Sequence, residues 1–198
     1  MGITIMKLLK YGNTNTFYLP GTRGGLLLDT NYAGTLPAFF KALKQNGITI
    51  KDILYLLVTH YHPDHMGIAG ELMDLGVDLL LVDIQTDAVH FSDRIFDREK
   101  RPYISIREEA ATVISCKESR DFLETLGIDG EILPTPSHSK DSISLVLDDG
   151  DCFVGDLEPL EYRKAYENNE ALKRDWDTLL AFHPKRIFYA HRPPDEFR

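Results

Sequence analysis

The sequence has few cysteines and no long apolar segment. Its two cysteines, Cys116 and Cys152, lie far apart and form no C-x-x-C pair, which fits a reducing compartment better than a disulfide-stabilised secreted domain. No stretch approaches the roughly 18 apolar residues of a membrane span, and the opening MGITIMKLLKYGNTN lacks the apolar core of a secretory signal. We therefore expect a cytoplasmic protein with no membrane partner.

Positive charge is also scarce. The chain carries 22 Lys and Arg residues against 31 Asp and Glu residues, for a formal net charge of −9. A field of this sign repels nucleic acids and anionic membranes unless a local basic patch outweighs it. We expect a small-molecule substrate and no nucleic-acid partner.

No repeat, low-complexity tract or Pro/Gly/Ser-rich linker divides the chain. A chain of 198 residues, 43% of them hydrophobic, can form one core and bury roughly 70% of its unfolded surface. We therefore predict a single domain over residues 1–198.

Short strands and amphipathic helices alternate along the chain. The predicted strands are Ile3–Leu9, Thr16–Leu19, Gly25–Asp29, Ile53–Val58, Val77–Val82, Ser142–Leu147, Cys152–Val154 and Arg186–Tyr189. The predicted helices are Thr35–Asn46, Gly67–Leu75, Arg107–Val113, Glu118–Leu126 and Asn168–Phe182. This pattern indicates two layers of strands with helices outside, although other α/β arrangements share the same periodicity.

A dense cluster of polar residues follows the apolar run Ile53–Val58. The segment from Thr59 to His65 contains three histidines and one aspartate, which are His60, His62, His65 and Asp64. Imidazole nitrogen and carboxylate oxygen are ligands that zinc and similar divalent metals prefer. In an extended segment His60 and His62 project to the same side, and a following turn can direct Asp64 and His65 toward a second ion. Two neighbouring metal sites are therefore possible.

This segment resembles the signature motif of the metallo-β-lactamase superfamily. The resemblance continues in order along the chain with Thr135–His138, Gly155-Asp156 and Ala190-His191, and earlier with Asn13–Leu19 and Leu26–Thr30. It implies an α/β (α+β) fold in which two mixed β-sheets flanked by helices form an αββα four-layer sandwich.

The resemblance also implies a metal-ligand set. His60, His62 and His138 would bind a first divalent ion, and Asp64, His65 and His191 would bind a second. Asp156 would bridge the pair. We expect two zinc ions, with iron or manganese as alternatives. By the same resemblance Asp29 would orient a ligand imidazole; its other interpretation is a turn-forming residue at a strand end.

Two adjacent divalent ions can hold a water, lower its pKa from about 15.7 toward about 7, and present a hydroxide for attack. No G-x-S-x-G nucleophile motif competes with this mechanism. Asp64 is the best-placed catalytic residue for passing a proton to the leaving group. We therefore predict a binuclear hydrolase acting on a small ester, thioester, lactone or phosphodiester.

Two other functions stay open. The superfamily also includes proteins that resemble flavodiiron enzymes and persulfide dioxygenases, so an iron-dependent oxidoreductase is the first alternative. A non-catalytic metal-binding module is the second. Bound redox-active iron with oxygen consumption would favour the former, and retained metal without turnover would favour the latter.

The segment Ile84–Arg107 is predicted to form the substrate-selecting wall, because it lies between the first ligands and His138. It mixes aromatic residues such as Phe91, Phe96 and Tyr103 with several cations, and we expect it to contact a small anionic or amphipathic substrate. The alternative is a solvated helix used for packing or for a homodimer contact. Lys140 and Arg192, each near a predicted ligand, are rival anion contacts.

Overall fold

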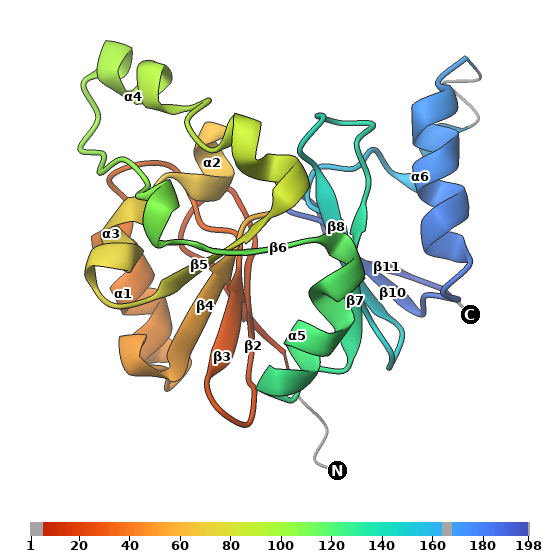
Figure 1. Ribbon diagram of the computed structural model, residues 1–198, viewed down its shortest axis with the longest axis horizontal. Helices are drawn as coiled ribbons and strands as arrows, with labels where there is room; N and C mark the ends of the chain where they lie inside the picture. The colour runs from red at the N-terminus through yellow and green to blue at the C-terminus, as the bar shows by residue number, and fades with distance from the viewer. Residues whose placement is uncertain (1–5, 164–167, 198) are drawn as a thin grey trace.

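Two mixed β-sheets face each other between layers of helices in the computed structural model, which describes residues 6–163 and 168–197 (Figure 1). The six-stranded sheet has the order β1 (Lys7–Leu9), β2 (Thr16–Leu19), β3 (Gly25–Leu28), β4 (Ile53–Leu57), β5 (Asp78–Val82) and β6 (Thr112–Ile114). The five-stranded sheet has the order β11 (Asp195–Glu196), β10 (Arg186–Phe188), β9 (Asp151–Phe153), β8 (Ile143–Leu147) and β7 (Gly130–Pro134). Strands β3 to β6 run parallel, as do β9 and β10, while the other pairs are antiparallel.

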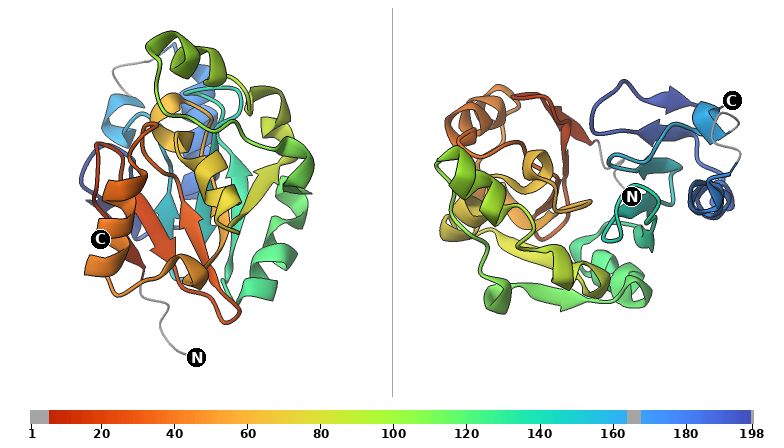
Figure 2. Two further views of the ribbon diagram at one scale, coloured as in Figure 1. Left: turned by 90° about the vertical axis from the view of Figure 1, so that its left-hand side faces the viewer. Right: turned by 90° about the horizontal axis from the view of Figure 1, so that it is seen from above.

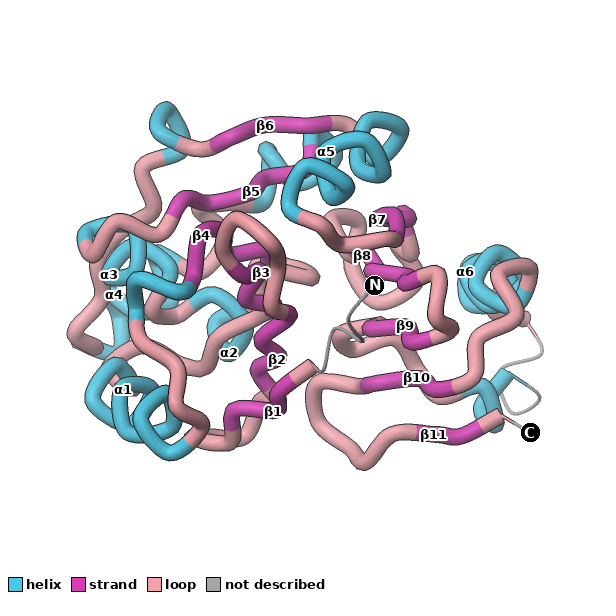
Figure 3. Tube along the Cα trace, turned by 90° about the horizontal axis from the view of Figure 1, so that it is seen from below, coloured by secondary structure: helices cyan, strands magenta, loops and turns pink. Residues whose placement is uncertain are grey.

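Helices cover the outer face of each sheet. On the six-stranded side lie α1 (Leu36–Gln45), α2 (Pro63–Met66) and α3 (Ala69–Asp74), and α6 (Glu170–Leu180) covers the five-stranded sheet (Figure 2). Helix α5 (Ser119–Leu126) closes one end of the space between the sheets, as Figure 3 shows from below. The predicted αββα sandwich is confirmed.

The apolar strands are continuous because both of their faces are buried. In β3, Leu26 and Leu28 enter the core between the sheets, whereas Leu27 points into the core beneath α1 and α3. Leu56 and Leu57 of β4 divide in the same way. Alternate residues of a strand point to opposite faces, so a run of leucines serves two cores at once.

Most predicted elements are confirmed with shorter bounds, and two predictions need correction. The predicted helix Arg107–Val113 is wrong. Its residues form a single turn at Glu108–Ala110 followed by β6, which pairs with β5. The β-branched run Thr112–Ile114 favours a strand, and pairing at the sheet edge satisfies its backbone. The predicted helix Gly67–Leu75 is confirmed as α3, but a separate short helix, α2, precedes it, so Asp64 and His65 lie on α2 instead of a turn.

Besides β6, the unpredicted elements include β7, which pairs with β8, β11, which pairs with β10, and the short helix α2. Helix α4 (Asp93–Glu99), also unpredicted, lies outside the main layers. Ile3–Ile5 of the first predicted strand lie outside the described residues. Both cysteines are free thiols. Among the described helices none combines the length and apolar character that crossing a bilayer requires.

Candidate metal centre

All seven predicted ligands gather where several strands end. His60 and His62 follow β4, Asp64 and His65 lie on α2, and the remaining three come from the loops after β7, β9 and β10: His138, Asp156 and His191. Residues up to 131 positions apart in the sequence, His60 and His191, thus meet at one rim between the two sheets. The structure brings together every residue that the sequence analysis assigned to the metals.

The first group consists of three imidazoles. His62 Nδ1 lies 3.0 Å from His60 Nε2 and 3.2 Å from His138 Nε2. The three nitrogens lie within 4.8 Å of one another, and His60 is buried. Three ring nitrogens converging on one point form a donor set suited to a borderline divalent metal.

The second group consists of one carboxylate and two imidazoles. Asp64 Oδ2 lies 3.1 Å from His191 Nε2 and 3.9 Å from His65 Nε2. These atoms also lie within 4.8 Å of one another. Each group therefore takes two residues from the segment His60–His65, and each is completed by a different distant histidine.

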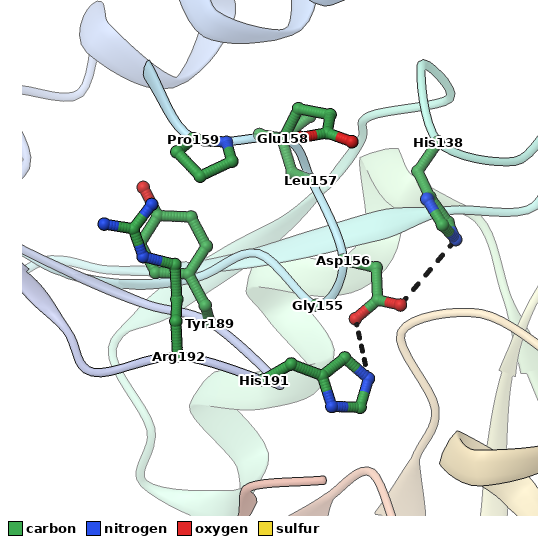
Figure 4. Close-up of a pocket in the computed structure, with 9 residues that line it drawn as sticks. All are labelled: His138, Gly155, Asp156, Leu157, Glu158, Pro159, Tyr189, His191 and Arg192. Carbon is green, nitrogen blue, oxygen red and sulfur yellow. Dashed lines mark ion pairs between the residues drawn. The ribbon is translucent and has the colours of Figure 1, made fainter. Parts of the chain in front are cut away.

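Asp156 lies between the two groups, and each of its oxygens faces one of them. Oδ2 lies 3.9 Å from His60 Nε2 and 3.8 Å from His138 Nε2. Oδ1 lies 3.4 Å from His65 Nε2 and 3.3 Å from His191 Nε2. Figure 4 shows the carboxylate directed between His138 and His191. This is the arrangement that a carboxylate shared by two ions would need.

The residue before Asp156 has to be glycine. Gly155 has φ of 57°, and an added Cβ would lie 2.5 Å from the Thr59 hydroxyl oxygen. A side chain at this position would be strained and would push against the loop that carries His60. The close approach of these two loops places the Asp156 carboxylate among the imidazoles.

The polar atoms at the centre fit a cation. His65 Nε2 and Asp156 Oδ1 are both buried and face each other, yet neither makes a hydrogen bond of normal geometry within the described structure. A buried polar atom without a partner is costly, and such atoms concentrate at functional sites. A divalent ion coordinated by this nitrogen and this oxygen would give both buried atoms a partner.

The second group holds protons when no metal is bound. Burial alone would lower the pKa of His65, but the carboxylates of Asp29 and Asp156 outweigh it and raise the pKa to about 10. Contacts with Asp156 and Asp64 raise the pKa of His191 to about 10 as well. The same contacts lower the pKa of Asp64 and Asp156 despite their burial.

The first group behaves in the opposite way. Burial and the neighbouring imidazoles hold the pKa of His60 well below its usual range, and burial lowers the pKa of His138. These rings are neutral at pH 7, which is the form that binds a metal. His60 and His138 therefore differ in charge from His65 and His191 before any ion arrives.

Asp29 contacts the His65 ring at Nδ1, the nitrogen that faces away from the metal centre. Its Oδ2 lies 3.1 Å from His65 Nδ1, and the carboxylate accepts hydrogen bonds from the Thr59 backbone N–H at 2.7 Å and from the Thr59 hydroxyl at 2.8 Å. The predicted contact of Asp29 is therefore made, and its partner is the His65 imidazole. On the other side of the site, Nδ1 of His191 lies 3.2 Å from the Asn13 carbonyl.

A cavity of about 260 Å³ opens beside three of the seven residues (Figure 4). Apart from His138, Asp156 and His191, its walls come from the segment Gly155–Pro159 and from Tyr189 and Arg192. The Arg192 guanidinium lies 4.9 Å from the centre of the Tyr189 ring and also pairs with Glu161 and Asp195, both at 3.3 Å.

The prediction that Ile84–Arg107 forms the substrate wall is wrong for Phe96, and no residue of that segment lines this cavity. Phe96 is fully buried and packs against Tyr103 and Tyr32, so it belongs to the core. Phe91 differs from Phe96, because it is 57% exposed and its ring lies 5.5 Å from that of His62. A six-residue helical turn over Asp83–Ala88 opens the segment, and α4 follows it.

Comparison with known proteins adds a family relationship. A sequence model described as the metallo-beta-lactamase superfamily matches residues 9–191. The chain is 26% identical to the beta-lactamase-like protein 2 homolog of Caenorhabditis elegans over 190 residues, which cover 91% of this chain and 56% of that protein. It is 26% identical over 185 residues to the homolog of the same name from Drosophila melanogaster, covering 90% of this chain and 58% of that protein. The chain thus spans little more than half the length of these relatives.

Among solved structures, a metallo-beta-lactamase family protein from Thermus thermophilus has the same fold. The match has a TM-score of 0.76 and 21% sequence identity, and it covers 96% of this chain and 74% of that one. At this level of identity the likeness concerns the fold.

Proposed function

Since this chain belongs to the metallo-beta-lactamase superfamily, we propose that it is a binuclear metal-dependent hydrolase of a small ester, thioester, lactone or phosphodiester. The observation that carries the proposal is the position of Asp156, whose two oxygens face two separate groups of nitrogen and oxygen donors. A site for a single ion would not require a second converging group on the far side of that carboxylate.

His60, His62 and His138 would hold the first ion, Asp64, His65 and His191 the second, and Asp156 both. Zinc is the metal we propose, because imidazole and carboxylate donors suit it, with iron or manganese as alternatives. When bound, such a pair supplies a nucleophile by ionising water near neutral pH and stabilises negative charge on the group under attack.

The protein's own residues orient the metal ligands and move a proton. Asp29 and Thr59 hold His65 in one orientation, and Gly155 allows Asp156 to reach the centre. Asp64 is 37% exposed on its side chain, and a lowered pKa keeps it ionised. We assign to it the transfer of a proton from the attacking water to the leaving group, because an ionised carboxylate that solvent can reach can accept that proton and its lowered pKa favours passing it on.

The cavity beside the metal centre is the proposed substrate site. Leu157, Pro159 and the Tyr189 ring offer apolar contacts, and Arg192 offers a cation. The ion pairs of Arg192 with Glu161 and Asp195 are long and partly exposed, so an incoming anion can replace one of them at little cost. A compact substrate with an anionic group fits this wall.

Charge and cysteine chemistry support the remaining parts of the proposal. A net charge of −9 argues against nucleic acids and anionic membranes as targets. The two free thiols fit the reducing cytoplasm. A homodimer stays open as a further state of assembly.

A panel of substrates on protein of defined metal content tests the proposal. Carboxylic esters, thioesters, lactones and phosphodiesters should be compared with and without a strong chelator, together with oxygen consumption. Chelator-sensitive hydrolysis of one class supports the proposal. Oxygen consumption by iron-loaded protein would support the oxidoreductase instead, and metal retention without any turnover would support a binding module.

A further inference from the structure

Tyr61 lies between His60 and His62, and side chains outside the metal centre bond to both its backbone N–H and its carbonyl. The backbone N–H of Tyr61 donates to Asp141 Oδ2 at 2.7 Å, and the Tyr61 carbonyl accepts from the Ser92 hydroxyl at 2.7 Å. Asp141 is 8% exposed, and Ser92 is fully buried. Both hydrogen bonds are therefore shielded from competing water.

Asp141 belongs to the same loop as His138. One side of that loop is attached to α6, because the backbone N–H of Ser137 donates to Asp175 Oδ2 at 2.7 Å. The other side is attached to the end of β4, where the buried Gln85 amide donates to the carbonyls of Asp141 at 3.0 Å and Val58 at 2.9 Å. The loop is fixed on both sides of His138, and Asp141 connects it to the His60–His62 peptide.

We propose that Asp141 is a positioning residue for the first metal: it sets His60 and His62 at the correct separation from His138. The proposal rests on the assignment of these three histidines as ligands under the proposed function. The connection is direct, because one carboxylate from the His138 loop holds the peptide that lies between the other two ligands.

The second group of ligands has a separate support. His65 is oriented by Asp29, which bonds to Thr59. Loss of Asp141 should therefore weaken the first site more than the second. It would also leave the buried N–H of Tyr61 without its partner, which destabilises the local loop conformation.

Asp141→Ala and Asp141→Asn form the test. The alanine variant removes the acceptor, whereas the asparagine carbonyl can still accept from Tyr61 N–H without the negative charge. We expect Asp141→Ala to bind the first zinc about 10- to 100-fold more weakly in chelator competition, the usual effect of removing an outer partner of a ligand. Asp141→Asn should bind it with near wild-type affinity, and the second zinc should be little affected in both.

A measurement without metal accompanies this comparison. Hydrogen exchange at the Tyr61 amide of the metal-free protein should be faster in Asp141→Ala than in wild type or Asp141→Asn. If Asp141→Ala fails to fold, Asp141→Glu takes its place: it keeps the charge but moves the carboxylate by one methylene, and it should also weaken the first site.

Wild-type first-site affinity in Asp141→Ala, or in Asp141→Glu where that variant is used, would overturn the proposal. Equal losses in Asp141→Asn and Asp141→Ala would overturn it too, because charge and not the hydrogen bond would then be responsible. A wild-type protein that holds no metal would instead contradict the proposed function, while the exchange measurement would still report on the hydrogen bond itself.

Discussion

The carboxylate of Asp29 lies 3.1 Å from Nδ1 of His65, on the side of the ring opposite the metal centre. Asp29 itself has a left-handed backbone conformation, with φ of 58°, and receives a backbone hydrogen bond from Thr59. A non-glycine residue in that region is strained, and strain of this kind persists where surrounding contacts fix it. The strained turn directs a buried carboxylate toward the His65 imidazole.

Asp29→Asn should weaken binding of the second metal by about 10- to 100-fold, since the amide cannot accept from His65 Nδ1 and Thr59 as the carboxylate does. Chelator competition on the purified variant measures this. Asp121→Asn, on an exposed position of α5, is the matched control and should bind as wild type does. Unchanged affinity for the second metal in Asp29→Asn would contradict the proposal that Asp29 orients His65.

Metal binding at the second group should release protons. The pKa values of His65 and His191 are both raised to about 10, so at pH 7 both rings are protonated in the metal-free protein. A metal replaces these protons, and its affinity for this group rises as the pH approaches 10. Calorimetry at pH 7 in buffers of different ionisation enthalpy should detect about two protons released, one from each ring.

The same shifts set the pH dependence of the metal-free fold. A folded pKa raised above the unfolded value of about 6.5 stabilises the fold below pH 6.5, and that stabilisation is lost as the pH rises through about 10. His60 works in the opposite direction, because its lowered pKa makes folding less favourable as the pH falls below about 6.5.

For the proton-release prediction, metal binding without proton release between pH 6 and pH 9 would contradict this description of the second group.

Arg192→Gln should raise KM for an anionic substrate about tenfold, or about 1.4 kcal/mol, while KM for a neutral substrate of the same shape stays nearly unchanged. The reason is loss of the cation on the cavity wall. Lys140→Gln is the comparison, since Lys140 was the rival anion contact predicted from the sequence. If Lys140→Gln and not Arg192→Gln discriminates between the two substrates, the anion contact lies on the His138 loop.

Two phenylalanines from one segment should respond differently. Phe96 is fully buried, so Phe96→Ala should lower the free energy of unfolding by about 3–5 kcal/mol. Phe91 is exposed beside His62, so Phe91→Ala should change kcat/KM with little change in stability. Thermal unfolding and kinetics on both variants separate the two roles. Equal loss of stability in both would mean that Phe91 also belongs to the packing.

The local sequence predicted the metal-ligand cluster better than the residues that surround and support it. The cluster from His60 to His65 is contiguous, and its residue types indicate metal chemistry on their own. His138, Asp156 and His191 could be assigned only through the family resemblance, because an isolated histidine or aspartate has no distinguishing neighbours. The structure brings all three to the cluster.

What the sequence did not predict depends on contacts between distant segments. The strand Thr112–Ile114 became visible only as a partner of β5, since three residues are too few for a clear alternating pattern. The cavity wall at Gly155–Pro159 and Tyr189 follows from the packing of two loops after parallel strands. Asp141 is an ordinary loop aspartate in the sequence, and only the fold places it against Tyr61.

The most direct test of the two-metal hydrolase is a titration of the metal-free protein with zinc, following turnover of the best substrate from the panel. The rate should rise and reach its plateau at two equivalents per chain, because each oxygen of Asp156 faces a separate group of ligands. In Asp156→Asn the plateau rate should fall and the second equivalent should bind weakly. Full activity at one equivalent, or two tightly bound equivalents with unchanged activity in Asp156→Asn, would contradict the shared carboxylate and with it the two-metal centre.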